Sequence, residues 1–332
     1  GLKVNGSESR VFCIVGDGEL DEGQIWEAAM AAAAFKADNL VAVIDRNNVQ
    51  ATDTIPNVLP NDCLKEKWEA FGWNTIEIDG HDQEQVERAL TAAKASGKVL
   101  QIGMVRRQAT DAQFVRERID KGDFGDIYHI RAVLLRRRGI PGLGGWFTTK
   151  AQSGGGPLID IGVHWFDAAM YVSGLWNPTS VSAMTYAKFG REMKNYRYVG
   201  MWAGPPRYDG VCDVEDYAAG FVRFGKKATM SFEIAWACNA DEGGYIEFLG
   251  TRAGARIFDG KPIKILTEQA NTIADVLPQT PDRGNAFRNQ ICSYLAACRG
   301  ERPPFATGEQ GLINMKLIDA VYKSGETGRE VA

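Results

Sequence analysis

Residues 154–174 read GGGPLIDIGVHWFDAAMYVSG, and this stretch decides how the larger part of the chain is interpreted. After the glycines, side chains of two kinds recur at the spacing of an α-helix, which predicts a helix over residues 158–172 with two faces. The polar positions are Asp160, His164, Asp167 and Tyr171, and the apolar positions are Leu158, Ile161, Trp165 and Val172. One face is expected to pack on a sheet and the other to line a site.

The polar face contains a candidate acid–base pair. His164, one helical turn after Asp160, is suited to take a hydroxyl proton as a general base. The preceding glycines allow a backbone to approach a ligand closely. For an isolated Asp–His pair the alternative is a helix-surface ion pair without chemistry. The surrounding motif favours the site.

The chain around this helix is dominated by strand-like segments. Short turns such as Phe224-Gly225-Lys226 join them and predict a large, mostly antiparallel sheet with helices on one face, an α+β arrangement. The strand at 228–237 is expected to carry apolar side chains on both faces and to be covered by a second copy of the chain. Predicted strands span residues 126–136, 179–186, 217–224, 228–237, 244–250 and 255–258, and predicted helices span 111–121, 283–299 and 308–324.

The pattern G-G-G-x-L-x-D-x-G-x-H-x-x-D resembles the signature of Gfo/Idh/MocA-type oxidoreductases. The resemblance runs from VLQIGMVRRQATDAQFVRERIDKGDFGDIYHIRAVL (99–134) to FATGEQGLINMKLIDAVYKSGETGREV (305–331), roughly residues 96–332. It implies NAD(P), a sugar or polyol substrate, catalytic roles for Asp160 and His164, and a homo-oligomer formed through the large sheet.

Two sequence motifs that the chemistry of that family requires have no counterpart in this chain. The chain contains no G-x-G-x-x-G turn for a dinucleotide. The family's catalytic lysine lies in a Glu-Lys-Pro motif, whereas here Glu66-Lys67 runs into Trp68 and Lys261-Pro262 follows Gly260. We therefore expect this substrate domain to lack its dinucleotide-binding half and to be inactive alone.

The N-terminal residues follow a different pattern, with strands and helices in alternation. Strands are predicted at 11–15, 39–45, 73–78 and 99–104, and helices at 22–35, 62–72 and 83–95. Alternation of this kind predicts a short parallel βαβ sheet, part of a doubly wound α/β domain.

The loops after the first two strands carry candidate ligands for an anion and a cation. Gly16, Gly18 and Glu19 surround Asp17 in a small glycine loop, which suits a diphosphate. Asp17, Asn47 and the carbonyl of Val49 offer three oxygens to magnesium. The alternative is that Asp17 is a turn residue and Asn47 a strand-end cap.

The segment VFCIVGDGELDEGQIWEAAMAAAAFKADNLVAVIDRNNVQ (11–50) resembles the thiamine diphosphate motif of transketolases. The resemblance continues through KWEAFGWNTIEIDGHD (67–82) and fades near residue 95. It implies thiamine diphosphate and Mg²⁺ as cofactors, with Glu22 facing a partner domain. The family's upstream histidine and its pyrimidine domain have no match, so only a weak half-site is expected.

The chain is thus interpreted as a chimera of a domain at 1–97 and a domain at 98–332, joined within ALTAAKASGKVLQIG (89–103). Recombination and an assembly error in the sequence both explain the join. The favoured function is that of a Gfo/Idh/MocA-like oxidoreductase domain. The alternatives are a thiamine diphosphate-dependent component that needs a partner chain, and a non-enzymatic or artefactual fusion.

Composition excludes several other classes of protein. The 332 residues carry a net charge of −4, with no basic patch for nucleic acid or membranes. No apolar run approaches the roughly 20 residues of a membrane helix. The six cysteines form no C-x-x-C pair, which disfavours zinc and favours free thiols in the cytoplasm.

Overall fold

The computed structural model describes residues 11–48, 55–77, 84, 85, 88, 91, 99–201, 203–258, 260–280 and 282–332. The chain divides into two compact units, Gly1–Asp79 and Gly80–Ala332. The predicted helix at 83–95 lies mostly outside the described residues, and so does most of the segment around the expected domain boundary at 97. That boundary stays a prediction.

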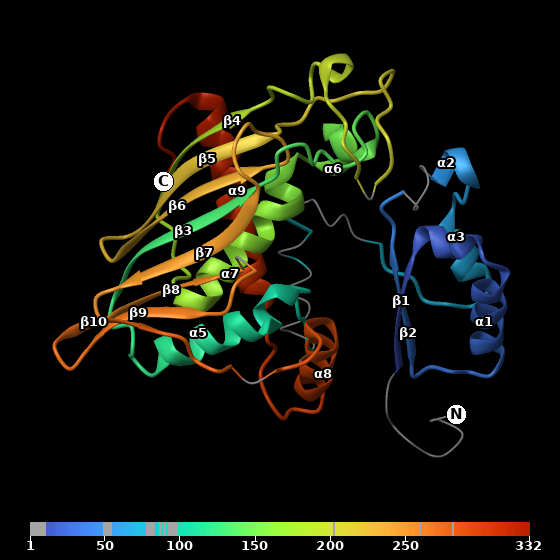
Figure 1. Cartoon of the computed structure of the whole chain (residues 1–332). Helices are drawn as coiled ribbons and strands as arrows, with labels where there is room; N and C mark the ends of the chain where they lie inside the picture. Colours follow the sequence, from blue (N-terminus) through green and yellow to red (C-terminus); the bar gives the residue numbers. More distant parts are fainter. Residues whose placement is uncertain are drawn as a thin grey trace. The chain divides into compact units, whose positions relative to one another are not determined.

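The first unit is a βαβ arrangement (Figure 1). Strands β1 (Val11–Gly16) and β2 (Leu40–Asp45) pair in parallel, and their last residues, Gly16 and Asp45, lie opposite each other. Between and after these strands come η1 (Asp17–Asp21), α1 (Gly23–Ala34), α2 (Ile55–Val58) and α3 (Leu64–Ala70). A small core of Val15, Leu20, Ala29, Leu64 and Trp68 joins sheet and helices. The predicted short parallel sheet is confirmed.

The predicted strands at 73–78 and 99–104 are wrong over their described residues. Trp73 packs edge-on against Trp68, with ring centroids 4.9 Å apart, and its Nε1 donates to the carbonyl of Ala29 at 3.0 Å. The indole therefore docks on a helix. Ile102 donates its N–H to the carbonyl of Ala306 at 2.9 Å, so this segment is attached to a loop near the C-terminus and not to a sheet.

The second unit contains an eight-stranded sheet in the order β10-β9-β8-β7-β3-β6-β5-β4. Every neighbouring pair is antiparallel except β3 and β6, which run parallel. The predicted large, mostly antiparallel sheet is confirmed. Its strands are β3 (Ile127–Leu135), β4 (Ser180–Tyr186), β5 (Tyr217–Phe224), β6 (Ala228–Ala235), β7 (Gly243–Gly250), β8 (Ala253–Ile257), β9 (Lys264–Gln269) and β10 (Thr272–Val276).

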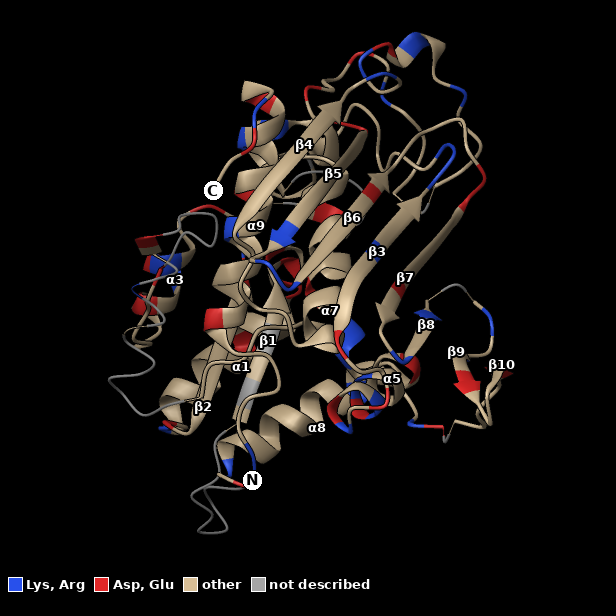
Figure 2. Cartoon of the chain, turned by 90° about the vertical axis from the view of Figure 1, so that its left-hand side faces the viewer, with Lys and Arg blue, Asp and Glu red and all other residues tan. Residues whose placement is uncertain are grey.

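Helices α5 (Thr110–Asp120), α7 (Val163–Ser173) and α9 (Gly308–Thr327) pack on one face of this sheet, and the other face is left uncovered in Figure 2. The core lies between these two layers, and the ring of Phe166 on α7 meets Phe232 on β6 there. The remaining elements are η2 (Val105–Gln108), η3 (Trp146–Thr148), α6 (Lys150–Ser153), the π-helical turn η4 (Leu158–Gly162), η5 (Met193–Asn195) and α8 (Ala286–Cys298).

Strand β6 does not have two apolar faces, as the sequence suggested. Its side chains alternate, with Met230, Phe232 and Ile234 buried under the helices. Over most of the strand the uncovered face instead carries Thr229, Ser231 and the exposed Glu233. The prediction is therefore wrong for most of this strand, because every second residue in it is polar.

No disulfide joins any of the six cysteines. Among the described residues, no helix has the length and apolar character needed to span a membrane.

Candidate functional site

The glycine motif is held in place by the chain itself. Glu215 accepts hydrogen bonds from the N–H groups of Gly156 at 3.0 Å and Leu158 at 3.2 Å, and from the hydroxyl of Tyr322 at 2.8 Å. Burial raises the pKa of the Glu215 carboxyl. A Cβ atom on Gly155 would meet the Tyr322 hydroxyl, and one on Gly156 would meet the Glu215 backbone. These two glycines therefore permit close packing within the protein.

Asp160 lies where strand β6 ends. Its Oδ2 accepts a hydrogen bond of 2.9 Å from Nε1 of the fully buried Trp236, the residue that follows β6. The ring of Phe147 lies edge-on to this indole. Since β3 and β6 run parallel, both end at the same edge of the sheet. The Asp160 carboxylate is thus anchored at the carboxyl end of the one parallel pair among the described strands of this sheet.

His164 lies in the first turn of α7 and is half-buried. Burial lowers the pKa of its imidazole, the nearby Arg106 lowers it further, and Asp160 and Asp167 oppose both effects. A histidine with a lowered pKa is neutral near pH 7 and is able to accept a proton. Asp160 lies in η4 and His164 in the first turn of α7, and Asp160 accepts its hydrogen bond from Trp236 and not from the imidazole.

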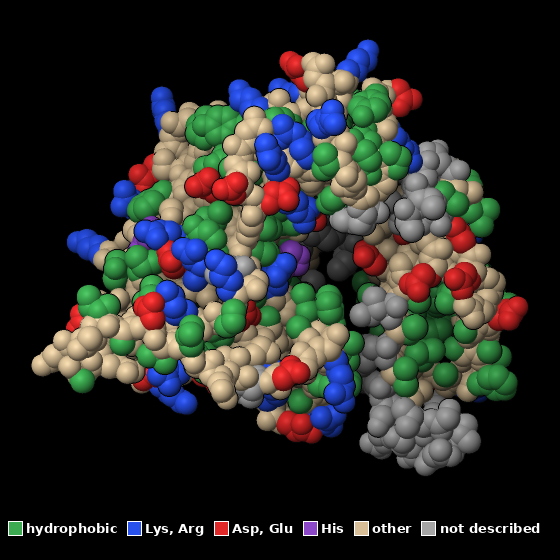
Figure 3. All heavy atoms as spheres, in the orientation of Figure 1, with side chains coloured by type: hydrophobic (Ala, Val, Ile, Leu, Met, Phe, Trp, Pro, Cys, Tyr) green, Lys and Arg blue, Asp and Glu red, His purple; other side chains and the backbone are tan. Residues whose placement is uncertain are grey.

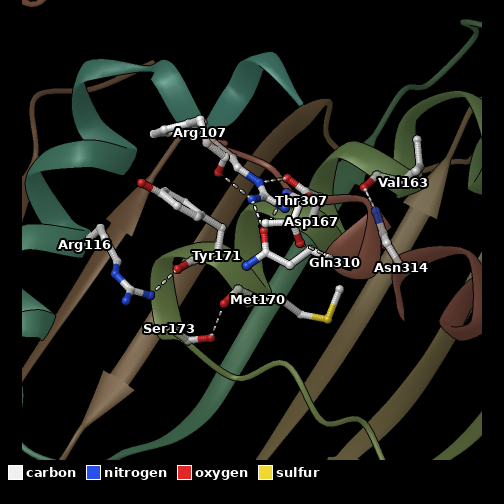
Figure 4. Close-up of polar contacts among 11 residues, drawn as sticks. Arg107, Arg116, Val163, Asp167, Met170, Tyr171, Ser173, Thr307, Gln310 and Asn314 are labelled. Atoms are coloured by element: carbon white, nitrogen blue, oxygen red, sulfur yellow. Dashed lines mark hydrogen bonds and ion pairs between the residues drawn. The ribbon is translucent and has the colours of Figure 1, made fainter. Parts of the chain in front are cut away.

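Asp167, which the helical pattern placed on the same face as His164, points into the core. Both of its oxygens accept hydrogen bonds from the buried Arg107, at 2.8 Å and 2.6 Å. Figure 4 shows this pair, with Arg107 also donating to Gln310. The Tyr171 hydroxyl accepts from Gln113 at 2.9 Å. These two positions of the predicted polar face therefore stabilise packing between helices.

Sequence reasoning missed Arg106. Its guanidinium lies over the ring of Trp165, 4.2 Å from the centroid, and 5.4 Å from the centroid of Phe258. Burial lowers the pKa of Arg106. The sequence offers only the adjacent pair Arg106-Arg107, and the structure shows that Arg107 has its acidic partner, Asp167, in the core.

In the first unit, the loop after β1 presents a buried carboxylate. Asp17 is 2% exposed, and its Oδ2 accepts from the N–H of Asn48 at 2.6 Å. Its Oδ1 is buried and has no hydrogen-bond partner in the described part of the chain. Burial raises the pKa of Asp17, and Asp45 contributes to the rise. An orphaned buried carboxylate oxygen fits a cation ligand.

The other predicted ligands of this loop lie as follows. Glu19 accepts a hydrogen bond of 2.6 Å from the N–H of Gly16, so its carboxylate occupies a donor that a phosphate would use. Asn47 and Glu22 are exposed, and Gly18 lies half-buried beside Asp17. Val49 lies outside the described residues.

Two family models match different parts of the chain. Residues 112–256 match the GFO/IDH/MocA C-terminal domain, and residues 3–106 match the thiamine diphosphate binding domain of transketolase. The chain is 35% identical over 250 residues to D-glucoside 3-dehydrogenase of Escherichia coli, an alignment that covers 75% of the chain and 68% of that protein.

The N-terminal part has separate relatives. It is 38% identical over 96 residues to an apulose-4-phosphate transketolase subunit of Phocaeicola vulgatus, in an alignment that covers 29% of the chain and 34% of that relative. The chain therefore spans about a third of this relative's length.

The fold has counterparts among solved structures. A levoglucosan dehydrogenase in complex with NADH and levoglucosan superposes with a TM-score of 0.65 at 16% identity, over 97% of the chain and 98% of that protein. At 16% identity, this similarity supports a shared fold and nothing further. The chain is thus a two-part protein that belongs to the GFO/IDH/MocA family through its larger part and carries a transketolase-type thiamine diphosphate-binding segment in its N-terminal part.

Proposed function

We propose that the second unit is the substrate domain of a sugar or polyol oxidoreductase in which Asp160 and His164 form the proton-transfer pair. The observation that carries this proposal is the anchoring of Asp160 by Trp236 at the carboxyl end of β6, beside a histidine of lowered pKa. The similarity to a protein named D-glucoside 3-dehydrogenase supports a sugar as substrate.

The chemistry of these two residues follows from their charges. A neutral His164 accepts the proton of a sugar hydroxyl, and the imidazolium that results is stabilised by the negative charge of Asp160. The indole N–H of Trp236 restricts the position of that carboxylate, so its charge stays directed at the site. A general base of this kind contributes about 10²–10⁴-fold to a rate.

The loop after β1 does not fit the pyrophosphate of NAD(P). Its Gly16 N–H is already taken by the Glu19 carboxylate, and the buried Asp17 adds a second acid. Dinucleotide loops instead leave glycine N–H groups free at the start of a helix. We therefore propose that the chain alone does not turn over with NAD(P).

The test combines turnover with titration. The purified full chain, incubated with NAD or NADP and a panel of sugars and polyols, is expected to form no reduced cofactor. In NMR titrations of histidine-labelled protein, Asp160→Asn is expected to lower the pKa of His164 further, because Asp160 favours the imidazolium. Glu233→Gln, on the uncovered face of the sheet, is the control and should leave that pKa unchanged.

Two results would contradict these expectations. Turnover that disappears in His164→Ala would show that the N-terminal unit serves as a nucleotide site after all. An unchanged pKa of His164 in Asp160→Asn would separate the two residues and remove the proton-transfer pair.

A second candidate function rests on the orphaned oxygen of Asp17. We propose that Asp17, Asn47 and the Val49 carbonyl hold Mg²⁺ while Gly16, Gly18 and Glu19 line a thiamine diphosphate half-site that needs a partner chain. The cation would offset the acidic charges of Asp17 and Glu19, which disfavour a pyrophosphate that arrives without a metal. Thiamine diphosphate, when bound, supplies a carbanion centre for transfer between sugars. In this loop, Asp17 would hold the cation through Oδ1.

Calorimetry of magnesium with thiamine diphosphate tests this half-site. Weak binding is expected for the full chain and none for Asp17→Ala, because the variant lacks the unpartnered carboxylate oxygen. Asp62→Ala, an exposed acid in the same unit, is the matched control and should bind like the parent. Equal binding by Asp17→Ala would exclude Asp17 as a ligand.

Self-association remains part of the proposal. The uncovered face of the large sheet is the surface proposed for a homo-oligomer, since no helix among the described residues packs on it. A cytoplasmic location stays a prediction. A non-enzymatic or artefactual fusion is the remaining alternative, and binding of neither sugar nor thiamine diphosphate would favour it.

A further inference from the structure

We propose that the site beside His164 takes an anionic sugar, a sugar acid or sugar phosphate, whose charged group binds Arg106. This inference deepens the proposed function of the same site and rests on it. It assigns Arg106 a role in choosing the substrate, whereas His164 and Asp160 act on a hydroxyl group.

The two arginines of η2 differ in the hydrogen-bond and ion-pair partners of their guanidinium groups. Arg107 is buried and donates to both oxygens of Asp167, to the carbonyl of Phe305 at 3.0 Å and to Gln310 at 2.6 Å. Arg106 has ring contacts with Trp165 and Phe258, and among the described residues its guanidinium makes no hydrogen bond or ion pair. An arginine fork presents five donors, and half-buried donors without acceptors favour a ligand that supplies them.

Asp111, the acid with the largest electrostatic effect on Arg106, does not form an ion pair with it among the described residues. Asp111 attracts Arg106 electrostatically, but its Oδ1 accepts from the N–H of Ala112 at 2.8 Å and its Oδ2 from the N–H of Phe258 at 3.0 Å. Both Asp111 oxygens are therefore occupied by backbone N–H groups. In the described part of the chain, no ion pair joins Asp111 to Arg106. Asp111 therefore offsets part of the charge of Arg106 without accepting hydrogen bonds from its guanidinium.

A second cation increases the need for an anion. Burial is the main cause of the lowered pKa of Arg106, and the like charge of Arg136, directly after β3, lowers it further against the opposing charge of Asp111. The guanidinium of Arg136 donates one long hydrogen bond, 3.5 Å to the carbonyl of Gly139. The pKa of His164 is lowered by the same positive charge of Arg106. On the face shown in Figure 3, Lys and Arg side chains also gather over the second unit.

Arginines also stack on aromatic rings without binding anything. Such a cation–π contact is stabilising and would by itself explain the position of Arg106. The chain offers a matched case, since Arg256 lies 4.1 Å from the ring centroid of Tyr245. Arg256 differs in having an ion-pair partner, Glu247, at 2.9 Å. Ring stacking is therefore common to both residues, and the missing acidic partner is particular to Arg106.

The test measures sugar binding to the full chain by the NMR resonance of His164, assigned with His164→Asn. Glucuronate and glucose 6-phosphate are compared with glucose. A charge-assisted hydrogen bond predicts that at least one anionic sugar binds roughly 10- to 100-fold more tightly than glucose. The stronger of the two identifies the anion as carboxylate or phosphate.

Variants of Arg106 and Arg256 test which arginine causes the preference for an anionic sugar. Arg106→Gln is expected to bind the anionic and the neutral sugar alike, Arg106→Lys to keep part of the preference, and Arg256→Gln to keep all of it. Equal binding of glucose and both anionic sugars by the parent chain, or a preference that survives Arg106→Gln, would overturn the role of Arg106 and leave the proposed function intact. Failure of every sugar to bind would overturn both.

Discussion

Asp167→Ala is expected to destabilise the second unit by about 3–5 kcal/mol, because it leaves the charge of Arg107 buried without a partner. The Arg107 side chain is 0% exposed and that of Asp167 is 1% exposed, so water cannot replace the lost carboxylate. Arg107 also joins three segments, since it donates to Asp167 on α7, to the carbonyl of Phe305 and to Gln310 on α9. Loss of the pair therefore weakens the layer that carries Asp160 and His164.

Thermal and urea unfolding of the full chain measure this effect. A loss of that size lowers the midpoint of the second unit by roughly 6–20 °C. Asp120→Ala is the control, because Asp120 pairs with Arg116 on the surface, and such a pair contributes about 0–1 kcal/mol. Arg107→Met combined with Asp167→Leu should recover much of the loss, since it removes both charges. Equal midpoints for the two aspartate variants would show that the buried pair does not stabilise the unit.

The sheet of the second unit was largely predictable from the sequence. The strands that were missed or wrongly predicted have a physical explanation. Strand β5 has the bounds expected from its alternating side chains and flanking turns. Strands β9 and β10 were missed because they form an exposed hairpin whose side chains show little apolar alternation, with Ile273 85% exposed. In the first unit, the apolar run at 73–77 wrongly predicts a strand. Its aromatic residue packs on a neighbouring helix, which periodicity alone does not distinguish.

The candidate site was predictable only in part. Helical spacing placed Asp160 and His164 one turn apart, and in the structure they lie on the consecutive elements η4 and α7. The same spacing assigned Asp167 to the site, whereas its partner Arg107 lies 60 residues earlier in a segment without helical or strand periodicity. Arg106 was missed for a related reason, because its surroundings come from α7 and from Phe258 after β8. Contacts between distant segments are set by tertiary packing, which local patterns do not encode.

Gly156→Ala is expected to destabilise the second unit by about 2–3 kcal/mol, near the upper end of the usual cost of adding a methyl group to a filled space. A Cβ atom at this position meets the backbone carbonyl oxygen of Glu215, well inside van der Waals contact. A backbone atom at the entrance to β5 cannot rotate away as a flexible side chain does. The two segments must separate, and that strains the hydrogen bond of 3.0 Å from the Gly156 N–H to the Glu215 carboxylate.

The consequence extends to the site, because the carbonyl of Gly156 accepts the N–H of Asp160 at 3.1 Å. Displacement of Gly156 should therefore move Asp160 relative to Trp236 and shift the NMR resonance of His164 as well as the unfolding midpoint. Gly243→Ala is the control, since nothing lies within 4 Å of a Cβ built there. It should change neither measurement. A Gly156→Ala protein with the parent's midpoint and an unmoved His164 resonance would show that Glu215 does not hold the motif in place. A lowered midpoint with an unmoved resonance would confine its role to stability.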